Sequence, residues 1–234
     1  MKKMLLEGAS EINVPLTDKQ VDQFLLYYDL LLEWNQKMNL TAITEPEEVI
    51  QKHFLDSLTC LETGLFFPGC RVIDVGTGAG FPSIPLKIAM PELSIVLLDS
   101  LQKRLTFLEE VADRLSLSGL SFCHARAEDA AIKTEYREMF DIAVARAVAP
   151  MNVLSELCLP FVKKGGYFVA MKGSRGEEEW AEGKGAISLL GGETEKIRKT
   201  RIDSHTIISI KKIANTPKKY PRRAGIPSKK PLIG

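Results

Sequence analysis

The chain of 234 residues has few cysteines and no long apolar run. Its four cysteines form no C-x-x-C pair and lack metal-ligand spacing, so neither a disulfide framework nor a metal site is expected. No apolar stretch reaches the roughly 18 residues of a membrane-spanning helix, and the lysines near the start precede no apolar signal segment. Because 45% of the residues are hydrophobic, the chain can bury a large core. We therefore expect a globular cytoplasmic protein that does not bind a membrane.

Acidic residues are absent from the stretch 211–234, which contains eight lysines and arginines. The whole chain has a net charge of +1, so the part before this stretch is acidic. This asymmetry is typical of a basic arm that binds nucleic acid, and the prolines within 213–234 favour an extended arm over a helix. A solvated tail is the alternative. The arm residues expected to contact RNA are Lys218, Lys219, Arg222, Arg223, Lys229 and Lys230.

The segment 72–82 is the most informative, because an apolar strand leads there into glycines at every second position. Gly76, Gly78 and Gly80 allow a sharp turn and a close approach of the backbone to a ligand. The helix that follows directs free N–H groups at such a ligand. The dinucleotide pattern G-x-G-x-x-G needs a packing glycine where Phe81 stands, which argues against a nicotinamide oxidoreductase. A tight strand-to-helix turn without a ligand is a further alternative.

Apolar runs that alternate with amphipathic helical patterns predict a doubly wound, mostly parallel sheet of the α/β class. The run Ser94–Asp99 ends in a carboxylate 19 residues after Gly80, about where such folds place the acid that binds ribose hydroxyls. Asp99 could instead cap the helix that follows. Ligands bind at the carboxyl ends of parallel strands, so the predicted strand ends should converge on one crevice. Further strands are expected at 120–124, 141–146 and 166–172, and near 204–211.

Two helices are expected before the first strand. Thr17 and Gln20 have the spacing of a capping box, and apolar residues then recur at intervals of three and four, which predicts a helix over 17–38. Pro46 follows a second start signal, and this helix is expected to reach about residue 59. Both helices are expected to cap the sheet or to cover the cofactor.

The second helix places His53 and Asp56 three residues apart on one side. The two side chains could form an acid–base pair, His53 could contact substrate RNA, or the histidine could be structural and bonded to a neighbouring carboxylate. The sequence leaves these roles open. We divide the chain into a helical extension over 1–69, a catalytic core over 70–212 and the basic arm over 213–234.

Several motifs together resemble one known family. The loop D-x-G-x-G-x-G, which begins at Asp74, is similar to the cofactor loop of class I S-adenosylmethionine (SAM) methyltransferases. In combination, the motifs resemble those of the bacterial 16S rRNA methyltransferase G family, also called glucose-inhibited division protein B. The segments that carry this resemblance are 39–41 (NLT), 52–57 (KHFLDS), 74–82 (DVGTGAGFP), 126–128 (RAE), 145–149 (ARAVA) and 218–223 (KKYPRR).

The resemblance implies an activity, a cofactor and a set of site residues. Members of this family use SAM to methylate N7 of a guanine in 16S rRNA near the decoding site, so 16S rRNA, a precursor particle or the small subunit is the expected partner. No obligate protein partner is expected. The positions that match the family's cofactor contacts are Gly76, Phe81, Ala127, Glu128 and Arg146, and the loop and strand pattern add Gly78, Gly80 and Asp99.

The residues themselves favour direct transfer of the methyl group. The loop after the strand 141–146 lacks the N-P-P-Y clamp of enzymes that methylate amino groups, and Cys158 lies within an apolar helical pattern, where a nucleophile is not expected. Guanine N7 already has a free lone pair and needs no general base. Arg146 is expected to bind guanine O6 or the cofactor, with a surface ion pair as the alternative. A catalytically silent RNA-binding protein on the same scaffold remains the rival.

Overall fold

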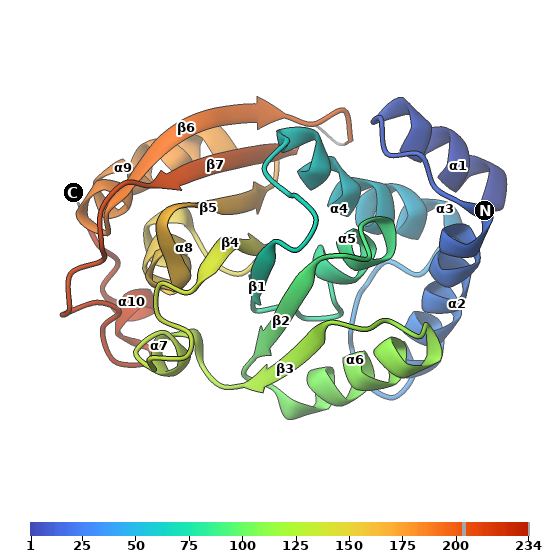
Figure 1. The fold of residues 1–234 in the computed structure, drawn as a ribbon, viewed down its shortest axis with the longest axis horizontal. Helices are drawn as coiled ribbons and strands as arrows, with labels where there is room; N and C mark the ends of the chain where they lie inside the picture. Colours follow the sequence, from blue (N-terminus) through green and yellow to red (C-terminus); the bar gives the residue numbers. More distant parts are fainter. Residues whose placement is uncertain (203–204, 234) are drawn as a thin grey trace.

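We describe residues 1–202 and 205–233 from a computed structural model. A seven-stranded sheet forms the centre of the molecule, with the strand order β3-β2-β1-β4-β5-β7-β6 (Figure 1). β7 is the only strand that runs in the direction opposite to the other six. The predicted doubly wound, mostly parallel sheet is therefore confirmed. The strands are β1 (Arg71–Val75), β2 (Ser94–Asp99), β3 (Leu120–His124), β4 (Phe140–Arg146), β5 (Val162–Lys172), β6 (Gly192–Lys199) and β7 (Thr206–Lys212).

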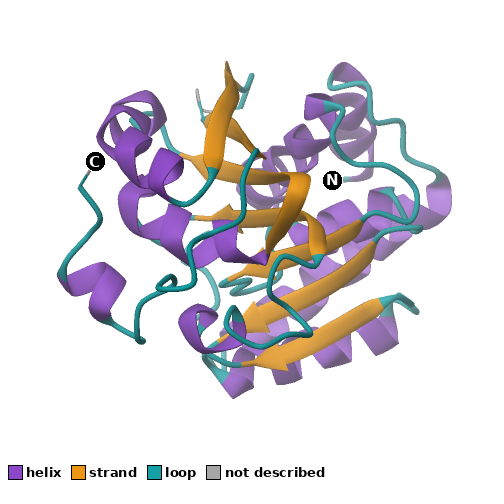
Figure 2. Cartoon of the chain, turned by 60° about the vertical axis from the view of Figure 1, so that its left-hand side comes forward, coloured by secondary structure: helices purple, strands orange, loops and turns teal. Residues whose placement is uncertain are grey.

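Helices cover both faces of the sheet, because successive strand residues point to opposite sides and both sides are apolar. Val72 and Val144 belong to the core of one face, whereas Ile73 and Ala143 belong to the core of the other. The first face packs against α2 (Asp18–Asn35), α5 (Ser83–Ala89) and α6 (Gln102–Arg114), and the second against α8 (Met151–Cys158) and α9 (Gly176–Leu189) (Figures 1 and 2).

The two helices predicted before the first strand are present. Thr17 and Gln20 form the predicted capping box at the start of α2, which ends three residues earlier than expected. The helix from Pro46 consists of α3 (Pro46–Val49), the π-helical turn η1 (Ile50–Leu55), α4 (Asp56–Leu58) and the 3-10 turn η2 (Thr59–Thr63). Together with α1 (Lys2–Glu11), these helices share the core of the first face. The division of the chain at residues 69 and 212 stays a prediction.

The predicted strands agree with the observed ones, and β4 and β5 begin one and four residues earlier than expected. The prediction of a last strand near 204–211 corresponds to β7, although Ser204 lies outside the described residues. Strand β6 and helix α9 were not assigned from the sequence. β6 is an edge strand with five charged residues among eight, the composition that protects a sheet edge but hides the apolar alternation. The remaining short elements are α7 (Ala127–Ala130), η3 (Leu159–Phe161) and α10 (Ile226–Lys229).

The basic arm does not have the extended conformation that its prolines suggested. Tyr220 is buried, and the main-chain oxygen of Tyr220 accepts a hydrogen bond from Arg137 Nη1 at 2.9 Å. The guanidinium of Arg222 binds the fully buried carboxylate of Glu156, with Nη2 2.6 Å from Oε2. Since a buried carboxylate needs a cation or hydrogen-bond donors, Glu156 holds the arm against α8. The role of Arg222 as an RNA contact stays a prediction, and in this structure its guanidinium is bound by Glu156.

Gly80 provides a test of the packing between the glycine loop and the helices. A Cβ at this position would lie 2.6 Å from Ile84 Cγ1 and 2.7 Å from Leu108 Cδ2, and φ is +97°. Gly80→Ala is expected to lower the free energy of unfolding by roughly 2–4 kcal/mol, as measured by urea denaturation. Gly78→Ala is the matched control, because its Cβ would meet only the main-chain oxygen of Gly76 at 3.9 Å. Equal losses of stability in the two variants would contradict the packing assigned to Gly80.

Candidate functional site

A cavity of about 490 Å³ lies at the carboxyl ends of β1, β2 and β4, where the sequence predicted a crevice. Among the residues predicted to bind the cofactor, the ones that line it are Gly76, Gly78, Phe81, Asp99, Ala127, Glu128 and Arg146. Gly80 does not line it, because this glycine faces Ile84, Leu108 and Tyr27 instead. Gly80 thus contributes to the packing of the loop, and its role as a cofactor contact stays a prediction.

The glycine loop presents bare backbone to the cavity. The N–H groups of Gly76 and Thr77 donate to the carbonyl of Leu98 at 2.8 and 3.0 Å, which ties the loop to the end of β2. Gly78 has φ +60°, and a Cβ added there would project into open space. Both features are needed where a ligand lies directly against the main chain. The loop therefore forms a cradle that a side chain at Gly78 would fill.

Asp99 is held rigidly at the end of β2. Its Oδ1 accepts from the N–H of Leu101 at 2.9 Å, and its Oδ2 accepts from the N–H of Gly78 at 3.0 Å and from Arg104 Nη1 at 3.3 Å. The N-cap residue of α6 is Leu101, so the alternative role of Asp99 as that N-cap is wrong. The fixed carboxylate retains lone pairs that suit the hydroxyl groups of a ribose.

Glu128 connects the cavity to the C-terminal arm, a link that the sequence did not reveal. This side chain is buried, and its Oε1 accepts a hydrogen bond from the N–H of Gly225 at 2.8 Å. Ser228 of α10 lines the same cavity. The arm therefore forms part of the wall. Nothing in the local sequence around Ser228 indicates this position, because it results from packing between residues 100 apart in the chain.

Asp74 supports the loop from within the protein and does not line the cavity. Its Oδ2 accepts a hydrogen bond from Thr77 Oγ1 at 2.8 Å. Burial raises the pKa of this carboxyl to about 7, although the Thr77 hydroxyl and the neighbouring Ser83 oppose the shift. Asp74 thus fixes the turn that leads from β1 into the glycines.

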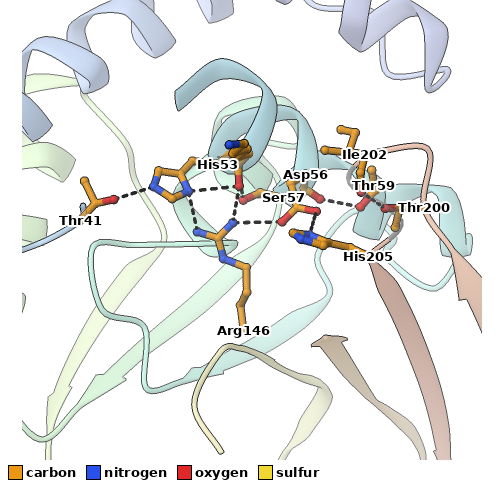
Figure 3. A network of polar contacts seen from close by, with 10 residues as sticks. Thr41, His53, Asp56, Ser57, Thr59, Arg146, Thr200, Ile202 and His205 are labelled. Carbon is orange, nitrogen blue, oxygen red and sulfur yellow. Dashed lines mark hydrogen bonds and ion pairs between the residues drawn. The ribbon is translucent and has the colours of Figure 1, made fainter. Parts of the chain in front are cut away.

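Arg146 joins the end of β4 to the helix before the sheet (Figure 3). Its Nη1 donates to Asp56 Oδ2 and to the carbonyl of Lys52, each at 3.1 Å. The guanidinium also lies 4.7 Å from the centre of the Phe81 ring, a cation–π contact. Asp56 is fully buried, so the alternative of a surface ion pair for Arg146 is wrong. The pair is internal, and it fixes the orientation of the guanidinium.

His53 packs its ring on Phe81, with the two ring centres 4.5 Å apart. Its Nε2 lies 2.8 Å from Thr41 Oγ1, and its Nδ1 lies 3.3 Å from Arg146 Nη2. Nδ1 also lies 3.1 Å from the carbonyl oxygen of Lys52, so this nitrogen contacts both a donor, the guanidinium, and an acceptor. Burial, together with the charge of Arg146, lowers the pKa of His53 to about 4. The histidine is therefore neutral at pH 7, and it lines the cavity.

The structure links His53 and Asp56, one of whose possible roles was an acid–base pair, through a third side chain. Arg146 contacts both side chains, and Asp56 Oδ1 binds His205 Nδ1 at 2.9 Å (Figure 3). The π-helical turn η1 has more residues per turn than an α-helix, which rotates His53 relative to Asp56. The sequence reasoning missed His205, because this residue, which directly precedes β7, is 149 residues away from Asp56 in the chain.

The cysteines do not offer a nucleophile. All four are buried, and burial raises the pKa of the Cys158 thiol well above its usual value. Among residues 1–202 and 205–233, no cluster of three or more histidine, cysteine, aspartate or glutamate side chains could hold a metal ion. In the same ranges, no helix combines the length and the apolar character needed to cross a membrane.

The low pKa of His53 makes the stability of the protein depend on pH. As the pH falls below 6.5, the unfolded chain protonates this histidine, whereas the folded chain does so only near pH 4. The contribution of the neutral His53 to the free energy of unfolding is therefore present above pH 6.5 and is lost as the pH falls toward 4. Relative to His53→Gln, the wild type should lose up to about 3 kcal/mol of its stability advantage across this window. Urea denaturation at several pH values measures this difference, and a difference independent of pH would contradict a buried neutral histidine.

The comparisons with known proteins agree with this geometry. The family model described as rRNA small subunit methyltransferase G matches residues 20–208. The ribosomal RNA small subunit methyltransferase G of Alkaliphilus oremlandii is 52% identical over 238 residues and covers 99% of each chain. The protein of the same name from Bacillus subtilis is 50% identical over 231 residues, covering 97% of each chain.

Solved structures of lower identity show the same fold. A MtNAS mutant in complex with S-adenosylmethionine aligns with a TM-score of 0.57 at 15% identity, over 82% of this chain and 75% of that one. TrmN from Thermus thermophilus aligns with a TM-score of 0.54 at 19% identity, over 70% of this chain and 53% of that one. The predicted class I fold, the methyltransferase activity and the SAM cofactor are confirmed, in preference to an oxidoreductase or a catalytically silent RNA-binding protein. The chain belongs to the rRNA small subunit methyltransferase G family.

Proposed function

We propose that the chain transfers the methyl group of SAM directly to N7 of a guanine in 16S rRNA near the decoding site. The observation that carries this proposal is that the glycine cradle, Asp99, Glu128 and Arg146 line the same cavity. The names of the relatives give small-subunit rRNA as their substrate. We further propose that the protein works in the cytoplasm on 16S rRNA, a precursor particle or the small subunit.

The residues of the cavity fit SAM. The bare backbone at Gly78 admits a ligand against the main chain, and Asp99 offers acceptors for ribose hydroxyls. Ala127, Glu128, Phe81 and Arg146 also line the cavity. When bound, SAM supplies an activated methyl group on a positively charged sulfur. We propose these residues, with Gly76, as the SAM-binding set.

The proposed reaction needs no acid or base from the protein. The lone pair of guanine N7 forms the new N–C bond while the C–S bond breaks, and the electron pair of that bond stays on sulfur. The purine ring gains the positive charge, and no proton moves in this step. Alignment of the two reactants can supply roughly 7–11 kcal/mol of barrier lowering. The neutral His53 and the fixed Arg146 are suited to such alignment.

A transfer assay tests the proposed function. RNA that contains the decoding-site segment is incubated with isotope-labelled SAM, and mass spectrometry locates the methyl group. The expected product is 7-methylguanine at one position. Gly78→Leu is expected to fold but to abolish SAM binding in calorimetry, because its side chain would occupy the cradle. Label on another atom or base would contradict the proposal, as would unchanged SAM affinity in the variant.

The exposed cations of the arm are proposed to contact RNA phosphates, and the salt dependence of binding tests this. They are Lys218, Lys219, Arg223, Lys229 and Lys230, because Arg222 is engaged by Glu156. Replacing the four lysines with alanine should reduce the slope of log affinity against log salt by about 0.7 for each lost phosphate contact.

The matched control removes the same charge elsewhere, by replacing the exposed lysines Lys2, Lys3, Lys19 and Lys37 of the N-terminal helices with alanine. This control should leave the salt slope near that of the wild type. Equal reductions in the two variants would show that the arm acts only through net charge.

A further inference from the structure

A second cavity lies beside the cofactor cavity. It encloses about 460 Å³ and shares His53, Arg146 and Ala147 with the first. This volume falls within the range of roughly 300–1,000 Å³ that is usual for small-molecule sites. Its other walls come from the ends of β5 and β7 and from the first turn of α9. The two cavities therefore adjoin, and His53, Arg146 and Ala147, the shared wall, border both of them.

Two charged side chains, Lys172 and Glu179, occupy the far wall of this second cavity. The Lys172 side chain is only 6% exposed, and its Nζ lies 2.7 Å from the carbonyl of Ala149 and 2.6 Å from Glu179 Oε2. Within the described part of the chain, no hydrogen-bond donor is well directed at this buried oxygen of Glu179. Burying the ammonium of Lys172 is costly, whereas the Glu179 side chain is 26% exposed and can be reached by a ligand in the cavity.

The order of these groups along the sheet edge is fixed by the topology. Strands β4 and β5 are neighbours, and Arg146 lies opposite Met171, the residue before Lys172. Glu179 follows in the first turn of α9. From the shared wall outward, the cavity therefore presents Arg146, then the ammonium of Lys172, then the carboxylate of Glu179.

The edge of a guanine carries complementary groups in the same order. N7 and O6 are acceptors, and N1–H and the 2-amino group that follow around the ring are donors. With N7 directed at the shared wall, O6 faces Lys172, and the two donors face Glu179. An adenine in this position would present its 6-amino donor to the ammonium and a lone pair to the carboxylate. Both contacts would be repulsive.

We propose that the second cavity is the guanine-binding pocket, with Glu179 as the residue that selects guanine through N1–H and the 2-amino group, and Lys172 as the partner of O6. This proposal rests on the proposed function and adds how the base is chosen. Reading an extruded base by its Watson–Crick edge is a known solution for enzymes that modify bases. Transfer to N7 also makes the ring positively charged, and the carboxylate of Glu179 is placed to stabilise that charge.

The test compares guanine with inosine, which lacks only the 2-amino group, at the target position of the RNA. For the wild type, kcat/KM should be about tenfold to a hundredfold higher with guanine. Glu179→Gln should lower kcat/KM on the guanine RNA and reduce the preference over inosine to a few-fold. Glu178→Gln is the matched control, because this exposed neighbour on α9 faces neither cavity. Its preference should equal that of the wild type.

Two further measurements separate selection from a loss of structure. SAM affinity in calorimetry should be the same in wild type and Glu179→Gln, since Glu179 does not line the cofactor cavity. Equilibrium binding of the two RNAs in the presence of S-adenosylhomocysteine should show the same reduced preference. If Glu179→Gln is unstable, Glu179→Asp keeps the charge on a shorter side chain and should keep part of the preference.

Each outcome decides the proposal. A wild type that methylates guanine and inosine equally would overturn the pocket assignment, and so would a Glu179→Gln variant that slows both substrates by the same factor. A wild type that produces no 7-methylguanine would overturn the proposed function as well. Normal methylation of guanine with unchanged discrimination in the variant would overturn the guanine pocket alone.

Discussion

The structure depends on how one buried charge is neutralised. Asp56 is fully buried in the helical segment before the sheet, and an unpaired carboxylate there would cost several kcal/mol. Arg146 from the end of β4 and His205 from directly before β7 supply the partners. The need to satisfy Asp56 therefore fastens the N-terminal helices to the carboxyl edge of the sheet, at the point where ligands bind in this class of fold.

The ion pair between Asp56 and Arg146 also determines the chemistry of the site. Arg146 is held over Phe81, and His53 packs on the same ring and is kept neutral by burial and by the nearby guanidinium. A neutral histidine and a permanently charged arginine can position a ligand but do not exchange protons at pH 7. Both side chains line both cavities. They can therefore position a methyl donor and a nucleophile relative to each other.

The sequence predicts the sheet and the glycine loop because their signals are local. The alternation of apolar runs, the glycine spacing and Asp99 depend on neighbouring residues alone. Contacts between distant segments leave no such signal, which explains why His205 was missed and why the packing of Gly80 against Leu108 was not predicted. The composition of the arm predicts a basic segment but not its contacts with the core. The buried Glu156 on α8 binds Arg222 of this segment.

The most direct test of the account is a crystal structure with S-adenosylhomocysteine and a short RNA that contains the target guanine. We expect adenosine beside Asp99 and Glu128, and the sulfur beside Arg146 and His53. Guanine N7 should be directed at that sulfur from the second cavity. A thioether sulfur far from Arg146, or a guanine bound outside the second cavity, would contradict the account.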